Sequence, residues 1–307
     1  DGQPDYKMNP ATDWIYKYYY NESGKIEREG ASNGSVRDTT ILVGVWTYYH
    51  ANGLKKAENL YSGTREKPWR LDGLFTKWDE NGQKVSEGHF KDGKQDGLGT
   101  FWHKNGQKVS EGHFKDGKPD GLWTGWYENG KTSKNINFKD GKQDGLGISW
   151  YENGEKKEES NWKDGKQDGL LTSWWENGKK KIEGNGKDGE RDGLWTSWYE
   201  NGEKKEESNY KDGKQDGLWI SWYENGQMES EGNGKDGKQD GLWTWWYENG
   251  QKWSEATFKD GINDGLLTWW YENGEKKEEN NWKDGKTDGL WTSWYENGQM
   301  ESERPFK

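Results

Sequence analysis

The stretch Gly193–Asp216 reads GLWTSWYENGEKKEESNYKDGKQD. Residues 194–199 are rich in aromatic and β-branched side chains, which favour a strand. The dipeptide Asn201-Gly202 follows, and it is a strong hairpin signal because both central residues of a type I′ turn need positive φ. A second strand is predicted over residues 203–210, after which the turn-forming segment 211–217 leads to the next copy. The stretch is therefore predicted to form one β-hairpin.

This hairpin recurs with a fixed period. The tripeptide Asp-Gly-Leu begins every 24 residues, at Asp72, Asp96, Asp120, Asp144, Asp168, Asp192, Asp216, Asp240, Asp264 and Asp288. Two divergent copies, at residues 14–24 and 44–53, precede the array, and terminal repeats of such arrays are commonly atypical. We therefore predict an all-β, elongated repeat protein of about twelve stacked antiparallel hairpins in a twisted meander sheet. Residues 1–71 would hold the divergent repeats and a cap, and residues 72–307 the ten regular repeats.

The composition excludes several classes of protein. Only 27% of the 307 residues are hydrophobic, yet the chain has 24 Trp and 45 Gly, so a compact aliphatic core is not expected. The aromatic content of 15% nevertheless argues for a folded chain. The net charge of -11 disfavours nucleic acid and anionic membranes as partners, and no apolar stretch is long enough to insert into a bilayer. The absence of Cys excludes disulfides and thiolate metal sites.

Cellular location is an expectation drawn from the first residue. The chain begins at Asp1, and a secretory signal cleaved before this residue would leave such a start. We expect an extracellular or cell-surface protein on this basis.

Comparison of the repeats with one another separates the two faces of the first strand. One face carries a Leu and a Trp four residues apart that never vary. The opposite face drifts, with Gly99, Trp123, Leu171 and Trp195 in one column. We predict that the uniform face packs repeat against repeat and that the drifting face is more exposed to solvent. The predicted stacking residues are Leu194, Trp198, Leu218, Trp222, Leu242, Trp246, Leu266, Trp270, Leu290 and Trp294.

The register of the second strand depends on the turn. A two-residue turn at Asn201-Gly202 places Trp198 opposite Lys205 and Thr196 opposite Glu207, so that Lys and Glu stems cover the indoles. A three-residue turn with a Gly bulge would shift this register by one residue, and the sequence leaves that alternative open.

The repeat resembles a known family. The run from Tyr210 to Trp219, YKDGKQDGLW, with Trp222-Tyr223-Glu224-Asn225-Gly226-Gln227 resembles the MORN-repeat variant of bacterial proteins labelled as YwqK-like antitoxin components. The resemblance covers about residues 72–307. It implies stacked β-hairpins in an elongated, twisted sheet that serves as a scaffold or interaction surface.

The sequence shows no group of residues typical of a catalytic or metal-binding site. Of the four histidines, His89, His103 and His113 stand where other repeats have Tyr or Asn, which is typical of surface or packing positions. Every Asp or Glu recurs once per repeat, which is improbable for an active site. Asp212 and Asp216 are interpreted as turn formers, with a calcium loop as the open alternative. We predict no enzyme activity, no cofactor and no metal site.

The first functional hypothesis is a structural or interaction protein, such as the subunit of an extracellular filament that assembles end to end. The edge strands of a meander offer unpaired backbone groups to a second copy or another protein. Pro305 removes one donor from the last strand and is alternatively a device that blunts this edge. Candidate assembly contacts are Thr39, Ile41, Leu42, Val43, Val45, Pro305 and Phe306.

The second hypothesis is a carbohydrate-binding or cell-surface adhesion module, because exposed indole rings stack on sugars. The densest aromatic cluster gives its candidate residues, Trp245, Trp246, Trp269 and Trp270. An antitoxin-type scaffold that binds a partner protein is the third hypothesis, and it rests on the family resemblance.

Overall fold

The computed structural model of the chain describes residues 6–8, 14–33, 41–62 and 70–306. It divides into two compact units, residues 1–154 and 155–307. This division falls inside the repeat array. The boundary predicted between residues 71 and 72 concerns where the regular repeats begin, and it stays a prediction.

The strands of the first unit alternate with short turns. They are β1 (Tyr6–Met8), β2 (Trp14–Tyr20), β3 (Ile26–Asn33), β4 (Ile41–Tyr49), β5 (Lys55–Ser62), β6 (Arg70–Trp78), β7 (Lys84–Lys91), β8 (Lys94–Trp102), β9 (Lys108–Lys115), β10 (Lys118–Trp126), β11 (Thr132–Lys139) and β12 (Lys142–Trp150).

The second unit continues the same pattern. Its strands are β13 (Lys156–Lys163), β14 (Lys166–Trp174), β15 (Lys180–Lys187), β16 (Glu190–Trp198), β17 (Lys204–Lys211), β18 (Lys214–Trp222), β19 (Met228–Lys235), β20 (Lys238–Gln239), β21 (Gly241–Trp246), β22 (Lys252–Lys259), β23 (Ile262–Trp270), β24 (Lys276–Lys283), β25 (Lys286–Trp294) and β26 (Met300–Phe306).

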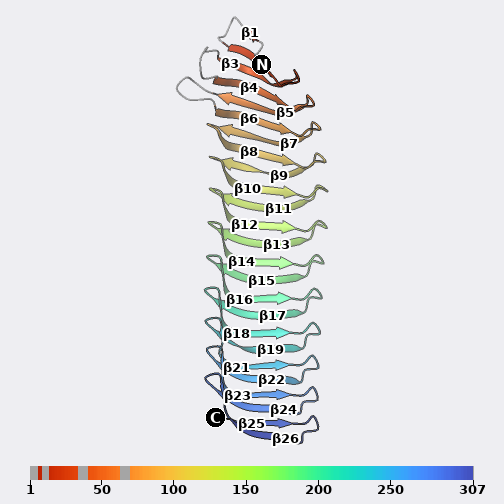
Figure 1. Cartoon of the computed structure of the whole chain (residues 1–307), viewed down its shortest axis with the longest axis vertical. Helices are drawn as coiled ribbons and strands as arrows, with labels where there is room; N and C mark the ends of the chain where they lie inside the picture. Colours follow the sequence, from red (N-terminus) through yellow and green to blue (C-terminus); the bar gives the residue numbers. More distant parts are fainter. Residues whose placement is uncertain (1–5, 9–13, 34–40, 63–69, 307) are drawn as a thin grey trace. The chain divides into compact units, whose positions relative to one another are not determined.

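Within each unit, strands that follow one another in the chain pair antiparallel, as Figure 1 shows. Aromatic and β-branched residues stand in the strands, and Gly, Asn and Asp stand in the turns that join them. The all-β class, the hairpins and the 24-residue period predicted from the sequence are confirmed. Among the described residues, none is helical.

The Asn-Gly turn differs from the predicted type I′ turn. The Gly202 amide donates to the Tyr199 carbonyl at 2.9 Å, and only the glycine of the Asn-Gly pair has positive φ, at 93°. This is the three-residue turn with a Gly bulge that the sequence left open. Trp198 therefore lies opposite Lys204, so the predicted pairing with Lys205 is wrong.

A second bulge then restores the predicted register farther along the strands. Lys205 is the extra residue, because the next pair after Trp198 and Lys204 joins Ser197 to Glu206. Thr196 consequently lies opposite Glu207, as predicted.

The type I′ geometry occurs instead at the Asp-Gly turn. Asp212 and Gly213 have φ values of 49° and 77°, and the flanking Lys211 and Lys214 pair across the turn. The segment predicted as a connecting loop is thus a tight hairpin turn. Asp212 acts as a turn former there, in line with the preferred interpretation of this residue.

The prediction of which face is buried is wrong. The large buried side chains lie on the drifting face, here called the packed face, which bears Trp195, Trp243 and Leu267 at 5–7% exposure. The opposite face, here called the leucine face, bears the invariant Leu and Trp columns. Leu194 on that face is 51% exposed and Trp198 is only half-buried.

Size complementarity between paired residues explains the drifting column. Trp195 and Trp243 lie directly against Gly184 and Gly232, where an added Cβ atom would come within 2.2 Å and 2.1 Å of an indole carbon. Leu267 instead faces Ala256. In these pairs a large side chain packs on a small one, and this buries apolar surface without an aliphatic core.

Candidate interaction surface

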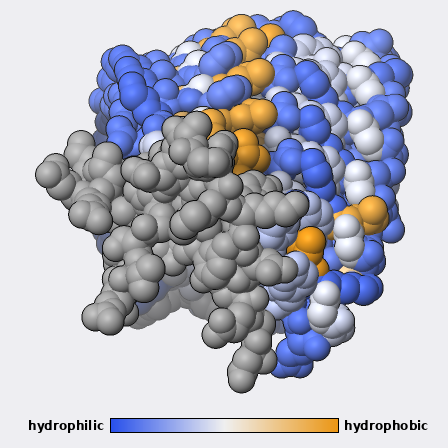
Figure 2. All heavy atoms as spheres, turned by 90° about the horizontal axis from the view of Figure 1, so that it is seen from above, coloured by the Kyte–Doolittle hydropathy of each residue, from blue (hydrophilic) through white to orange (hydrophobic). Residues whose placement is uncertain are grey.

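The leucine face carries one exposed leucine from every regular repeat. Figure 2 shows hydrophobic residues in a row among hydrophilic ones. This leucine row consists of Leu74, Leu98, Leu122 and Leu146 in the first unit and Leu170, Leu194, Leu218, Leu242, Leu266 and Leu290 in the second, each 38–53% exposed. Polar residues alternate with the leucines, because Leu194 pairs with Asn209 and Leu218 with Asn233. A repeated apolar side chain that stays in solvent marks a candidate contact surface.

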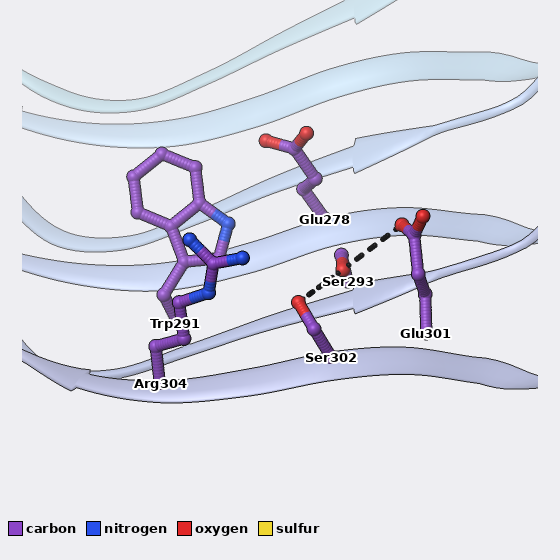
Figure 3. A pocket seen from close by; sticks show the side chains of 6 residues that line it. All are labelled: Glu278, Trp291, Ser293, Glu301, Ser302 and Arg304. Carbon is purple, nitrogen blue, oxygen red and sulfur yellow. Dashed lines mark hydrogen bonds between the residues drawn. The ribbon is translucent and has the colours of Figure 1, made fainter.

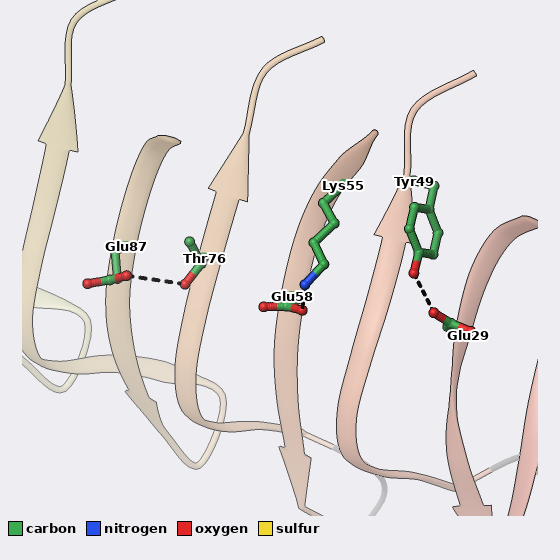
Figure 4. A network of polar contacts seen from close by, with 6 residues as sticks. All are labelled: Glu29, Tyr49, Lys55, Glu58, Thr76 and Glu87. Carbon is green, nitrogen blue, oxygen red and sulfur yellow. Dashed lines mark hydrogen bonds and ion pairs between the residues drawn. The ribbon is translucent and has the colours of Figure 1, made fainter. Parts of the chain in front are cut away.

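The rest of the leucine face is occupied by internal contacts. Lys204 forms an ion pair with Glu207 at 2.6 Å, and its Nζ lies 5.6 Å from the Trp222 ring of the next repeat. The same arrangement occurs in the first unit, where Figure 4 shows the Lys55–Glu58 ion pair and the hydrogen bond from Thr76 to Glu87. Lysine stems therefore lie over the Trp column, but they come from Lys204 and its equivalents in the preceding repeat and not from Lys205, as the predicted register required.

A hydrogen bond links most hairpin tips to the next, and the sequence analysis missed it. The hydroxyl of Tyr223 donates to the carbonyl of Trp246 at 2.7 Å. Tyr199, Tyr247 and Tyr271 donate in the same way to the Trp one repeat ahead. In earlier repeats a ring nitrogen of His50 or His103 lies at 3.0 Å or 3.3 Å from that carbonyl. The recurrence of a polar ring directly after each Trp was the available signal.

We expect the Tyr223→Phe variant to lose stability, because the Trp246 carbonyl loses its donor, at a cost of about 1 kcal/mol. Burial, followed by the charges of Glu229 and Glu248, raises the pKa of Tyr223 above its ordinary value. A raised folded-state pKa means that the stabilisation is complete below the unfolded pKa of about 10 and is lost as pH rises through the folded value.

Urea unfolding followed by circular dichroism, at neutral and at alkaline pH, measures this effect. The difference between the wild type and Tyr223→Phe should shrink as pH rises. Tyr295→Phe is the matched control, because that side chain is 51% exposed and has no following hairpin among the described residues. Equal losses in both variants would contradict a role for the link between tips.

The four candidate sugar-stacking tryptophans do not form one surface. Trp245 and Trp246 are successive residues of β21 and so lie on opposite faces, as do Trp269 and Trp270 of β23. Trp245 stacks on Trp243, with ring centres 5.8 Å apart, and Lys252 lies over Trp270 at 5.5 Å. The prediction of a single four-ring surface is wrong, because adjacent strand residues point in opposite directions.

The candidate assembly contacts near the N-terminus lie in an interior strand. Ile41, Leu42, Val43 and Val45 belong to β4, whose neighbours are β3 and β5. Both backbone edges of β4 are paired from Trp46 to Tyr48, whereas Ile41 and Leu42 pair only with β3 in the described register. The strand is thus inside the sheet and does not form its edge. Val45 is 54% exposed and extends the leucine row by one position. Thr39 lies outside the described residues.

The last described strand, β26, differs from the equivalent strands of earlier repeats. Arg304 stands where Gly232 stands three repeats earlier, and it faces Trp291 (Figure 3). A pocket of about 530 Å³ opens here, and the Ser293 hydroxyl in its wall donates to Glu301 at 3.2 Å. A tryptophan of another hairpin added to β26 would meet Arg304, whereas Trp243 packs on the small Gly232 at the equivalent position.

Pro305 adds to this difference. It occupies the position of Asn233, whose carbonyl accepts a hydrogen bond from the Asp240 amide of the following strand. The backbone of this position therefore faces outward, where proline offers no donor. Both residues make β26 a poor template for strand addition. Phe306, the last candidate contact, pairs with Gly289 within the sheet.

Neither a cluster of metal ligands nor a membrane-spanning helix occurs in the described ranges. In this part of the chain, no three His, Asp or Glu side chains lie close enough to hold a metal ion. No helix there has the length and apolar character needed to cross a membrane.

The repeated hairpin matches a known protein family. A sequence profile described as MORN repeat variant matches ten consecutive segments, namely residues 71–92, 95–116, 119–140, 143–164, 167–188, 191–212, 215–236, 239–260, 263–284 and 287–307. The chain belongs to the MORN repeat variant family. The resemblance inferred from the sequence is thereby confirmed. Each MORN repeat contributes one member of the leucine row, and most contribute a link between hairpin tips.

The search of proteins with curated functions finds no match. Among solved structures, the chain is similar to crystal structures titled TcdB2-TccC3-TEV, with 11% identity and a TM-score of 0.20, and TcdB2-TccC3, with 12% identity and a TM-score of 0.13. The alignments cover 91% and 95% of this chain but only 20% and 18% of those chains.

Proposed function

We propose that this MORN repeat protein is a non-catalytic structural protein that associates with further copies of itself through the leucine row. The observation that carries the proposal is the unbroken recurrence of a 38–53% exposed leucine in all ten regular repeats. A buried packing role would not leave these side chains in solvent, and the packing is done by the opposite face.

The period of the row favours a second copy as the partner. Successive leucines are two strands apart, about 9.6 Å, with a shorter polar residue between them. A partner inserts an apolar side chain into every gap only if it repeats with the same spacing. A second copy of this chain has that spacing by construction, and it forms a self-complementary interface of the kind common in homodimers.

Sedimentation velocity over a wide range of concentrations tests the proposal. We expect the wild type to associate with increasing concentration, and the fourfold variant L194T/L218T/L242T/L266T to remain monomeric with an unchanged far-UV circular dichroism spectrum. Threonine retains strand propensity, so the sheet should persist. A monomeric wild type, or unchanged association of the variant, would overturn the proposal.

End-to-end assembly through sheet edges is the second candidate, because an edge strand of an open sheet offers unpaired backbone groups to another copy. The fourfold variant separates the two candidates, since association that persists in it would support the edge as a contact and a monomer would support the leucine row. Adding Pro305→Asn to this variant restores an outward backbone donor at β26, so renewed association would show that Pro305 blunts this edge in the wild type.

A further inference from the structure

A pocket of about 300 Å³ opens on the packed face of the first unit, over β4, β5 and β6. Ala57 and Asn59 of β5 form its floor. Tyr48 stands on the β4 side, while Phe75 and Lys77 stand on the β6 side. The short Ala57 side chain between Tyr48 and Lys77 leaves the space open. We call this feature the Tyr48 pocket.

Asn59 breaks the pattern of its column. Most equivalent positions hold a small residue, such as Gly184 or Ser208, on which a neighbouring side chain packs. Asn59 is only 8% exposed, and its Nδ2 donates to the Tyr61 hydroxyl at 2.8 Å. Its Oδ1 has no hydrogen-bond partner among the described residues. A buried acceptor without a donor costs folding free energy. The Oδ1 atom is enclosed, so a ligand hydroxyl or N–H would meet it, and remove that cost, when the Asn59 side chain turns towards the pocket.

The tyrosine beside Asn59 can also bind a polar ligand. The Tyr48 hydroxyl lies 3.2 Å from that of Tyr61, and burial raises the pKa of Tyr48, so it keeps its proton. The Tyr48 and Phe75 rings stand on opposite sides of the floor, where they offer apolar surface to a flat or C–H-rich molecule.

The charge around the pocket is positive, although the whole chain has a net charge of -11. Lys56 and Lys77 line the rim, and neither amine makes an ion pair with another described residue. Arg28 lies opposite Tyr48 in the neighbouring strand, while Glu27 is the one carboxylate in the lining. The excess of cations favours an anionic ligand.

We propose that the Tyr48 pocket binds a sugar acid, that is, a hexuronate unit, free or at the end of a glycan. Its C–H face would lie between Tyr48 and Phe75, a ring hydroxyl would donate to Asn59 Oδ1, and its carboxylate would meet Lys77. An amino acid fits less well because its ammonium group would face the lysines. A simple aromatic carboxylate lacks the donor that Asn59 requires. This inference is independent of self-association through the leucine row.

Saturation-transfer difference NMR of the full chain with glucuronate tests the site. We expect transfer to the sugar protons of glucuronate and much weaker transfer to glucose, which lacks the carboxylate. Lys77→Ser and Asn59→Ser place in this site the residues found at Ser197 and Ser208, so both should fold. Each should weaken glucuronate binding about tenfold, because each removes one polar contact to the ligand.

Asn280→Ser is the matched control, since Asn280 is also buried, occupies the same column in the second unit and is not among the residues that line the pocket. It should leave binding unchanged. Absence of transfer to glucuronate, equal binding of glucose, or unchanged binding in both Lys77→Ser and Asn59→Ser would overturn the proposal. An oligouronide that binds more tightly than glucuronate would identify a glycan end as the source of the ligand, and equal binding would identify the free acid.

Discussion

Replacement of Trp243 by alanine is expected to lower the free energy of unfolding of residues 155–307 by about 3–5 kcal/mol. Trp243 is 5% exposed, lies against Gly232 and donates its indole N–H to the Asn233 carbonyl at 2.9 Å. Its removal leaves a cavity and takes one of two donors from the Asn233 carbonyl, which also accepts from the Asp240 amide. The adjacent Leu242 is 53% exposed, so Leu242→Ala should cost about 1 kcal/mol or less.

Urea unfolding followed by far-UV circular dichroism compares the two variants, since this signal does not depend on the removed indole. Leu242 belongs to an invariant column and Trp243 to a variable one. Invariance alone would therefore predict the larger loss of stability for Leu242→Ala, which is the opposite of the result expected here. A loss for Leu242→Ala as large as that for Trp243→Ala would show that the leucine row packs the sheet, and would contradict its assignment as a contact surface.

Much of the fold was predictable from the sequence because turn chemistry and period are local properties. The Asp-Gly-Leu period, the strands and the hairpins all follow from residues within one repeat. The pairing of Thr196 with Glu207 was predictable. The bulge at Lys205 was not, because nothing in its side chain distinguishes it from Lys204.

The buried face could not be predicted by comparing repeats one column at a time. Invariance at Leu194 suggested packing, yet the buried positions vary in residue type, because a large side chain on one strand packs on a small one across from it. Gly184 with Trp195 and Ala256 with Leu267 fill similar space with different residues. A comparison of paired columns would have revealed this, but it requires the register between consecutive hairpins.

The Tyr48 pocket could not be predicted by comparing repeats, for a related reason. It depends on Asn59 and Ala57, which belong to a divergent repeat, and on their partners Phe75 and Lys77 in the next hairpin. The offset of 29 residues between these repeats hides the alignment.

The proposed aromatic cluster failed for a simpler reason. Trp245 and Trp246 were grouped because they are adjacent in the sequence, but adjacent residues of a strand lie on opposite faces of the sheet.

The steric fit beneath the tryptophans leads to the second large effect. Gly232→Ala should destabilise the second unit by about 2–3 kcal/mol, because the new Cβ atom would lie 2.1 Å from an indole carbon of Trp243. Gly88→Ala is the matched control in the same column. There the nearest atom is the flexible Gln95 Nε2 at 3.3 Å, so the first unit should keep its stability or gain slightly.

A compensating substitution distinguishes this steric conflict from a general intolerance of side chains at Gly232. Ala256 already faces Leu267 in the same unit, and both are buried at 2% and 6% exposure. The double variant G232A/W243L reproduces this pair, so it should be more stable than the sum of the two single losses predicts, by about 1 kcal/mol or more. Additive losses in urea unfolding would mean that Gly232 is needed for its backbone alone. A positive coupling would mean that the cost of a side chain at Gly232 comes from its steric conflict with Trp243.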